Sequence, residues 1–213
     1  MQGPHRIEDV IAAGASLVEA KAAVILVHGR GATADSMLSL AEAFGRDDIA
    51  YLAPQATGNT WYPYPFLAPL VANEPWLSSA LALLGAVLAR LGDKGFPAER
   101  VGIVGFSQGA CLSTEFAARN ARRYGFVAAL TGGLIGPPGT PRNHSGSLDG
   151  TPIFLGSSDV DPHVPLERVH ETRDVLTALS GKVDERIYAG MAHIVNDDES
   201  AAVSALLAAL ATA

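Results

Sequence analysis

The sequence lacks the features that fix a protein outside the cytoplasm. Its only cysteine, Cys111, cannot form an intramolecular disulfide. No apolar run reaches the roughly 18 residues that a membrane-spanning helix needs. The N-terminus lacks the basic start and apolar core of a signal peptide. These absences predict a cytoplasmic protein without stable membrane insertion.

Charged residues are also scarce, at 17% of the 213 residues against 48% hydrophobic ones. A chain of this length and apolarity can bury a large core, so we expect one domain over residues 1–213. The net charge of −7 disfavours nucleic acid as a partner. Because the sequence has no zinc-type ligand spacing, no Walker loop and no G-x-G-x-x-G, we expect no cofactor and no metal.

Short apolar runs alternate with stretches of helical spacing along the whole chain. The expected strands are Ala23–Val27, Ile49–Ala53, Val101–Val104, Phe126–Thr131, Pro152–Leu155 and Val183–Tyr188. The expected helices are about Ala34–Phe44, Pro75–Leu91, Gln108–Arg122, Leu166–Leu179 and Asp197–Ala211. Apolar runs separated by helices are typical of a parallel sheet covered on both faces. The sequence therefore predicts a doubly wound α/β fold.

Two segments do not resemble packed elements. Pro54–Glu74 is rich in aromatic residues and proline, and Gly132–Gly150 is rich in glycine, proline and serine. Both follow expected strands, and loops at the carboxyl ends of parallel strands build binding sites. For the second segment we favour a mobile surface loop. For the first, Trp61, Tyr62, Tyr64 and Phe66 are candidates to line an apolar pocket, although the loop could simply pack on the sheet edge.

The strongest motif is Gly105-Phe106-Ser107-Gln108-Gly109, which matches G-x-S-x-G. It directly follows an expected strand and directly opens an expected helix. A serine on such a tight turn has a strained backbone and projects its hydroxyl clear of the sheet. This context predicts that Ser107 is a nucleophile.

A nucleophilic serine needs a histidine base, and this fold type orders the chain as serine, acid, histidine. The downstream histidines are His144, His163, His170 and His193. His193 lies between the last expected strand and the last expected helix, where a loop can return an imidazole over the sheet. We therefore predict His193 as the base. The acid should follow the strand Pro152–Leu155, where Asp159 and Asp161 compete, and spacing does not separate them.

Acyl transfer also needs two N–H donors for the oxyanion. The backbone N–H of Gln108 is one candidate, because it follows the nucleophile. The second is the N–H of Arg30, in His28-Gly29-Arg30-Gly31 after the first expected strand. The Arg30 side chain could steer an anionic substrate or point to solvent.

Four motifs occur in order across nearly the whole chain: His28-Gly29-Arg30-Gly31, Gly105-Phe106-Ser107-Gln108-Gly109-Ala110, Asp161-Pro162-His163-Val164-Pro165 and Gly190-Met191-Ala192-His193. Together they resemble the phospholipase/carboxylesterase family of α/β-hydrolases, which includes acyl-protein thioesterases and small bacterial carboxylesterases. The resemblance implies a fold without a lid domain and a Ser-His-Asp triad. It selects Asp161 as the acid and supports Arg30 and Gln108 as oxyanion donors.

The chain departs from that family at Ala32, where an aspartate is frequent. This variant resembles small esterases associated with the degradation of hydroquinone and aromatic rings. We therefore expect a small-molecule ester with a small or medium acyl or aryl group as substrate. Thioester or lysophospholipid hydrolysis by the same triad is the alternative within catalysis. A non-catalytic receptor on the same fold is the alternative outside it, and a homodimer is compatible with the sequence.

Overall fold

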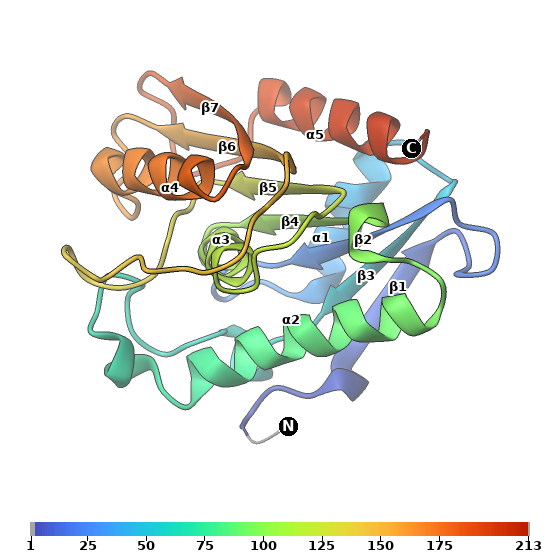
Figure 1. The fold of residues 1–213 in the computed structure, drawn as a ribbon, viewed down its shortest axis with the longest axis horizontal. Coiled ribbons are helices and arrows are strands. Elements are labelled where there is room, and N and C mark those ends of the chain that lie inside the picture. The colour runs from blue at the N-terminus through green and yellow to red at the C-terminus, as the bar shows by residue number, and fades with distance from the viewer. Residues whose placement is uncertain (1–2, 213) are drawn as a thin grey trace.

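A central sheet of seven strands, in the order β1-β3-β2-β4-β5-β6-β7, organises the structure (Figure 1). The structure is a computed structural model that describes residues 3–212. The strands are β1 (Val10–Gly14), β2 (Ala22–Val27), β3 (Ile49–Pro54), β4 (Val101–Phe106), β5 (Phe126–Leu130), β6 (Pro152–Ser158) and β7 (Lys182–Tyr188). All neighbouring pairs are parallel except β1 with β3. The predicted α/β fold is confirmed.

Five helices cover the two faces of the sheet (Figure 1). They are α1 (Ala34–Ala43), α2 (Trp76–Asp93), α3 (Gln108–Arg119), α4 (Leu166–Ala178) and α5 (Asp197–Leu210). Helices α1 and α5 pack on one face, and α2, α3 and α4 pack on the other, so each face has its own buried apolar cluster. Strands β2, β3 and β5 are buried throughout, and β4 is buried up to its last residue, Phe106, which explains their apolar runs. Short 3-10 helices occur at Ile7–Asp9, Thr57–Asn59, Leu70–Asn73 and Ala98–Arg100.

The sequence did not predict β1. This strand pairs antiparallel with β3, with Val10 opposite Pro54 and Gly14 opposite Ala50. It forms the edge of the sheet and is only partly buried along its length. Its sequence, Val-Ile-Ala-Ala-Gly, is an apolar run of only four residues, of which two are alanines, and it lacks a clear alternation, so the local signal for a strand was weak.

Capping side chains fix where two helices begin. Thr33 caps α1 and accepts from the backbone N–H of Ser36, and the acidic residue Asp35 lies inside the first turn. Asn196 caps α5 and accepts from the N–H of Glu199, whose carboxylate accepts from the N–H of Asn196 in return. Reciprocal bonds of this kind satisfy two N–H groups that a helix start leaves free.

Helix α2 is long and apolar enough, by length and composition alone, to cross a membrane. Half of it is buried against the sheet and α3, as in the core helix of a globular protein.

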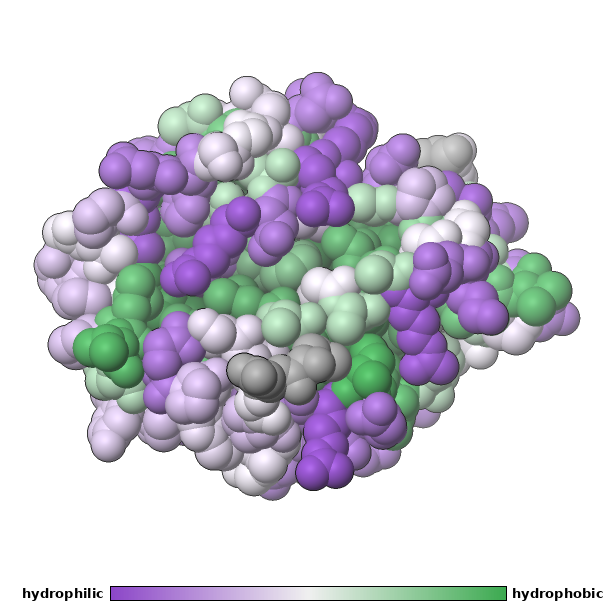
Figure 2. Space-filling model, turned by 60° about the horizontal axis from the view of Figure 1, so that its bottom comes forward, coloured by the Kyte–Doolittle hydropathy of each residue, from purple (hydrophilic) through white to green (hydrophobic). Residues whose placement is uncertain are grey.

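Figure 2 turns the bottom of Figure 1 forward. On this face apolar residues form an interrupted band bordered by hydrophilic ones.

The second irregular segment is anchored at its start, which contradicts the expectation of a mobile surface loop there. Leu134 and Ile135 are fully buried. Arg168 on α4 donates to the carbonyl oxygens of Leu134 and Gly136, each at 2.6 Å. The N–H of Ile135 donates to the buried carboxylate of Glu115. Burial of this backbone requires such partners, and helices α3 and α4 supply them.

Candidate active site

Ser107 lies on the sharp turn between β4 and α3, with φ 54° and ψ −118°. This left-handed backbone is strained for a residue with a side chain. The flanking glycines are required by close packing. A Cβ atom at Gly105 would collide with the carbonyl of Gly109, and one at Gly109 would collide with the carbonyl of Val27. The G-x-S-x-G motif therefore builds a turn that only small neighbours permit.

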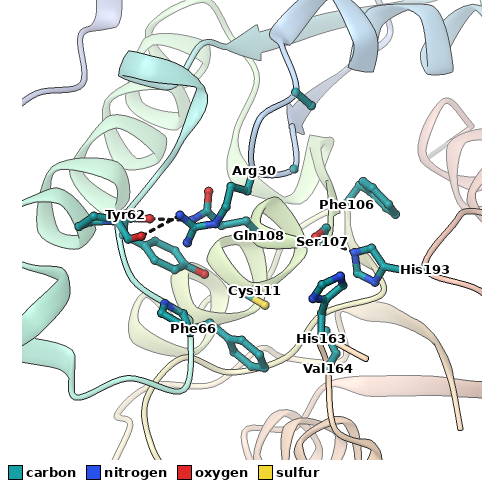
Figure 3. Close-up of a pocket in the computed structure, with 14 residues that line it drawn as sticks. Arg30, Tyr62, Phe66, Phe106, Ser107, Gln108, Cys111, His163, Val164 and His193 are labelled. Atoms are coloured by element: carbon teal, nitrogen blue, oxygen red, sulfur yellow. Dashed lines mark hydrogen bonds between the residues drawn. The ribbon is translucent and has the colours of Figure 1, made fainter. Parts of the chain in front are cut away.

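A chain of hydrogen bonds joins three of the predicted residues, of which Figure 3 draws Ser107 and His193. The Nε2 of His193 lies 2.8 Å from the Oγ of Ser107, and its Nδ1 lies 2.7 Å from the Oδ2 of Asp161. The loops after β4, β6 and β7 carry these residues, so the carboxyl edge of the parallel sheet brings them together. Asp159, the other candidate acid, does not bond His193. Its carboxylate accepts from the backbone N–H of Gly190 instead.

Hydrogen bonds keep Asp161 ionised despite burial. Burial disfavours the charged form, but the bonds from His193 and from the backbone N–H groups of His163 and Val164 outweigh it and lower the pKa of the carboxyl. Those two N–H groups lie 2.7 and 2.9 Å from Oδ1, while Oδ2 faces the imidazole. The carboxylate is thereby oriented to hold a proton on Nδ1 of His193, which leaves Nε2 free to accept one from Ser107.

The two predicted oxyanion donors flank Ser107. Gln108 is the first residue of α3, so its N–H has no partner within the helix. The loop after β2 passes close to the turn, and a Cβ atom at Gly29 would lie 3.3 Å from that of Ser107. Within residues 3–212, neither the N–H of Gln108 nor that of Arg30 donates to a protein acceptor. Both are therefore available to an oxygen bound beside Ser107.

The side chains of the same two residues hold the aromatic loop. Arg30 donates to the Oγ1 of Thr60 and to the carbonyl oxygens of Pro63 and Tyr64, at 3.1, 2.9 and 2.8 Å. Gln108 accepts from the N–H of Trp61 at 2.9 Å and donates to the carbonyl of Tyr62 at 2.8 Å. The loop is thus fixed to both sides of the turn that carries Ser107.

A pocket of about 570 Å³ opens at Ser107 (Figure 3). Its lining is mostly apolar, and two of the four predicted aromatic residues, Tyr62 and Phe66, contribute to it. The prediction was wrong for the other two. Trp61 is fully buried behind the loop, where its indole N–H donates to the carbonyl of His28 at 2.7 Å. Tyr64 is 56% exposed and does not line the pocket.

Several lining residues were not predicted. Phe106 and His163 both contact His193, with ring centroids 5.4 and 4.9 Å from the imidazole. Both occur inside the motifs that predicted the triad, Phe106 directly before Ser107 and His163 two residues after Asp161, so their positions already offered a signal. Cys111 is buried and also lines the pocket. Burial raises the pKa of its thiol to about 12, so it does not supply a thiolate nucleophile.

The buried His28 has a structural role. His28 is fully buried, and its Nε2 accepts from the backbone N–H of Ala56 at 3.0 Å, while its Nδ1 faces the carbonyl of Gly29 at 2.8 Å. Burial lowers the pKa of His28, which favours the neutral ring that this bonding needs. Among residues 3–212, no group of three histidine, cysteine or acidic side chains is arranged to hold a metal ion.

The chain is similar to several known proteins. The chain is similar to a protein from Dyadobacter fermentans described as a phospholipase/carboxylesterase. Its crystal structure superposes with a TM-score of 0.92 at 43% identity, covering 97% of this chain and 99% of that one. It is also 27% identical to acyl-protein thioesterase 1 of Saccharomyces cerevisiae, over 87% of this chain and 91% of that protein. Acyl-protein thioesterase 1 of Candida albicans is 29% identical, over 86% and 90% of the two chains.

The profile of one protein family covers almost the whole chain. It is described as Phospholipase/Carboxylesterase and matches residues 8–211. The sheet order and the flanking helices are those of the α/β-hydrolase fold, as in the structural relatives. The chain therefore belongs to the phospholipase/carboxylesterase family.

Proposed function

We propose that this protein hydrolyses carboxylic esters with small or medium acyl or aryl groups, using Ser107, His193 and Asp161 as a catalytic triad. The observation that carries the proposal is the continuous hydrogen-bond chain from Ser107 through His193 to Asp161, with steps of 2.8 and 2.7 Å. It ends in a carboxylate that is kept ionised and begins at a hydroxyl that opens on a pocket.

The reaction follows from these contacts. The Oγ of Ser107 attacks the ester carbonyl carbon while its proton moves to Nε2 of His193. The carbonyl oxygen becomes negatively charged, and the N–H groups of Arg30 and Gln108 bind it. The C–O bond to the alcohol then breaks, and His193 gives its proton to the departing oxygen. A water molecule repeats the sequence on the acyl-enzyme and releases the acid. Asp161 stabilises the imidazolium in both halves.

The pocket favours compact substrates. Tyr62, Phe66 and Cys111 bound it with apolar surface, and no domain covers its entrance among residues 3–212. Such a surface binds acyl or aryl groups by removing them from water. A panel of aryl and alkyl esters from acetate to palmitate measures the upper limit of the acyl chain.

Thioester hydrolysis is the second candidate. The fungal relatives are named acyl-protein thioesterases, and they match this chain over more than four-fifths of its length. The same triad can attack an ester or a thioester carbonyl. Matched oxygen and sulfur esters of one acyl group distinguish the two activities.

A test of the proposal uses a fluorophosphonate probe, which labels activated serines. We expect the protein to be labelled and the Ser107→Ala variant to remain unlabelled, with a fall in kcat of about 10⁶-fold. Tyr51→Phe is a matched control, because Tyr51 lies on the opposite face of the sheet, in the cluster under α1 and α5. An unlabelled protein without ester hydrolysis would instead indicate a receptor.

A further inference from the structure

The pocket differs in charge from the protein around it. The chain carries a net charge of −7, yet none of the 14 residues that line the pocket is acidic. The lining includes one permanent cation, Arg30, and two imidazoles, His163 and His193. The charged side chain that lines the pocket is therefore positive, whereas the net charge of the whole protein is negative.

The charge of Arg30 is not neutralised by the protein. Its three side-chain hydrogen bonds go to one hydroxyl and two backbone carbonyls, and within residues 3–212 it forms no ion pair. These bonds use three of its five N–H groups, so Nε and one N–H of Nη2 remain for a ligand. The guanidinium lies 5.9 Å from the ring centre of Tyr62, on the pocket wall. It is thus held in place and still able to bind.

The other charges near the pocket are already paired. Arg168, beside Phe66, forms an ion pair with Glu171 at 2.9 Å. Glu115, buried behind Cys111, pairs with Arg119 and Arg142 at 2.7 and 3.7 Å. The carboxylate of Asp161 is buried and engaged by His193 and by two backbone N–H groups. Among the residues that the structure describes, Arg30 is therefore the arginine of this region that lacks a counter-charge.

We infer that the preferred ester of this enzyme carries an anionic group, such as a carboxylate, which binds Arg30 while the ester carbonyl lies at Ser107. The inference rests on the proposed function and narrows its substrate class. The net negative charge of the protein does not oppose it strongly, because charges beyond about 8 Å are screened at physiological salt. A fixed guanidinium in contact with the substrate acts within that distance.

The test compares esters that differ only in charge. On the alcohol side, para-carboxyphenyl acetate is compared with the neutral compound in which its carboxylate is a methyl ester, para-(methoxycarbonyl)phenyl acetate. On the acyl side, the para-nitrophenyl monoester of adipic acid is compared with its neutral methyl ester. Each value of kcat/KM is divided by the rate of alkaline hydrolysis of the same ester. The expected result is a preference of about tenfold for the anionic ester in at least one pair, and the pair identifies the side that carries the charge.

Three variants assign the preference to Arg30. In Arg30→Gln the preference should disappear, whatever happens to total activity, whereas Arg30→Lys should retain it. Arg100→Gln is the matched control, because Arg100 also lies over an aromatic ring, 5.5 Å from Phe96, but sits before β4 at the opposite edge of the sheet. It should leave the preference unchanged. Raising NaCl from about 20 mM to about 500 mM should weaken the preference in the wild-type protein, without any variant.

The outcomes separate the two proposals. Hydrolysis of both neutral esters with equal or lower values for the anionic ones would overturn the inference and leave the esterase function intact. A preference that survives in Arg30→Gln would also overturn it. If no ester of either kind is hydrolysed and Ser107 is not labelled, the proposed function itself fails.

Discussion

Asp161 and Glu199 are two buried carboxylates beside the C-terminal half of β6, and they differ in ionisation. Burial raises the pKa of Glu199 to about 7, because, within residues 3–212, only the N–H of Asn196 bonds its carboxylate and the Oε1 atom has no partner. Asp161 is also buried, but three hydrogen bonds lower its pKa. Burial alone therefore does not decide whether these two carboxyl groups are ionised. The number of hydrogen-bond donors to each carboxylate decides it.

The difference is consistent with the two locations. Asp161 faces the imidazole that must become positively charged during the proposed reaction. Glu199 packs against Gly156, where a Cβ atom would collide with Oε1, and it closes the capping box of α5. The charge of Asp161 would stabilise the imidazolium of His193, whereas the carboxylate of Glu199 serves mainly as a hydrogen-bond acceptor for the backbone.

Removing the charge of Asp161 should have the largest effect on activity. In Asp161→Asn, the amide can no longer stabilise an imidazolium and favours the wrong tautomer of His193. We expect kcat to fall about 10⁴-fold. Asp159→Asn is the control, since Asp159 bonds Gly190 and not His193. Equal losses in the two variants, measured by steady-state ester hydrolysis, would contradict the assignment of Asp161.

Neutralising Glu199 should instead change stability, with a defined pH dependence. Its folded pKa of about 7 exceeds the ordinary value of 4.5, so the folded state holds a proton that the unfolded state loses. Stability should therefore fall as pH rises from about 4.5 to about 7 and then level off. Glu199→Gln should remove this fall. The free energy of unfolding of the variant, relative to that of the wild type, should therefore increase by about 3 kcal/mol between low pH and pH 8.

Urea unfolding of both proteins at several pH values measures this effect. Glu167→Gln is a suitable control, because Glu167 is an exposed acidic residue in the first turn of α4. It should leave the pH dependence as in the wild type. A constant difference between wild type and Glu199→Gln from pH 5 to pH 8 would show that Glu199 ionises normally.

The smallest expected effect concerns the cap that holds Glu199. Asn196→Ala removes the side-chain acceptor for the N–H of Glu199, at 2.8 Å, and should lower the free energy of unfolding by about 1 kcal/mol. Thr33→Ala removes the matching cap of α1 and should cost a similar amount. Both variants should keep the wild-type pH dependence, because the backbone N–H that bonds the carboxylate of Glu199 remains in Asn196→Ala. A weaker pH dependence in Asn196→Ala than in Thr33→Ala would show that the side chain of Asn196 controls the ionisation of Glu199.

Much of this architecture could be predicted because its signals are local. Six of the seven strands and all five helices follow from apolar runs and helical spacing, since burial on both faces leaves a direct pattern in the sequence. The predicted ends were less accurate. Helix α3 stops at Arg119, not Arg122, because Asn120 already leaves the helical conformation. The edge strand β1 was missed because half-exposed strands leave a weak pattern.

The turn at Ser107 could be predicted from local sequence, since the two glycines and the strand and helix around it are neighbours in the chain. Local sequence did not determine the rest of the site. Spacing left Asp159 and Asp161 equal until the family resemblance favoured one, and the fold brings Asp161 to His193. Only the tertiary structure turned Tyr62 and Phe66 into the pocket and Trp61 away from it. Side-chain direction in an irregular loop depends on distant partners, here Arg30, Gln108 and His28, which no local pattern records.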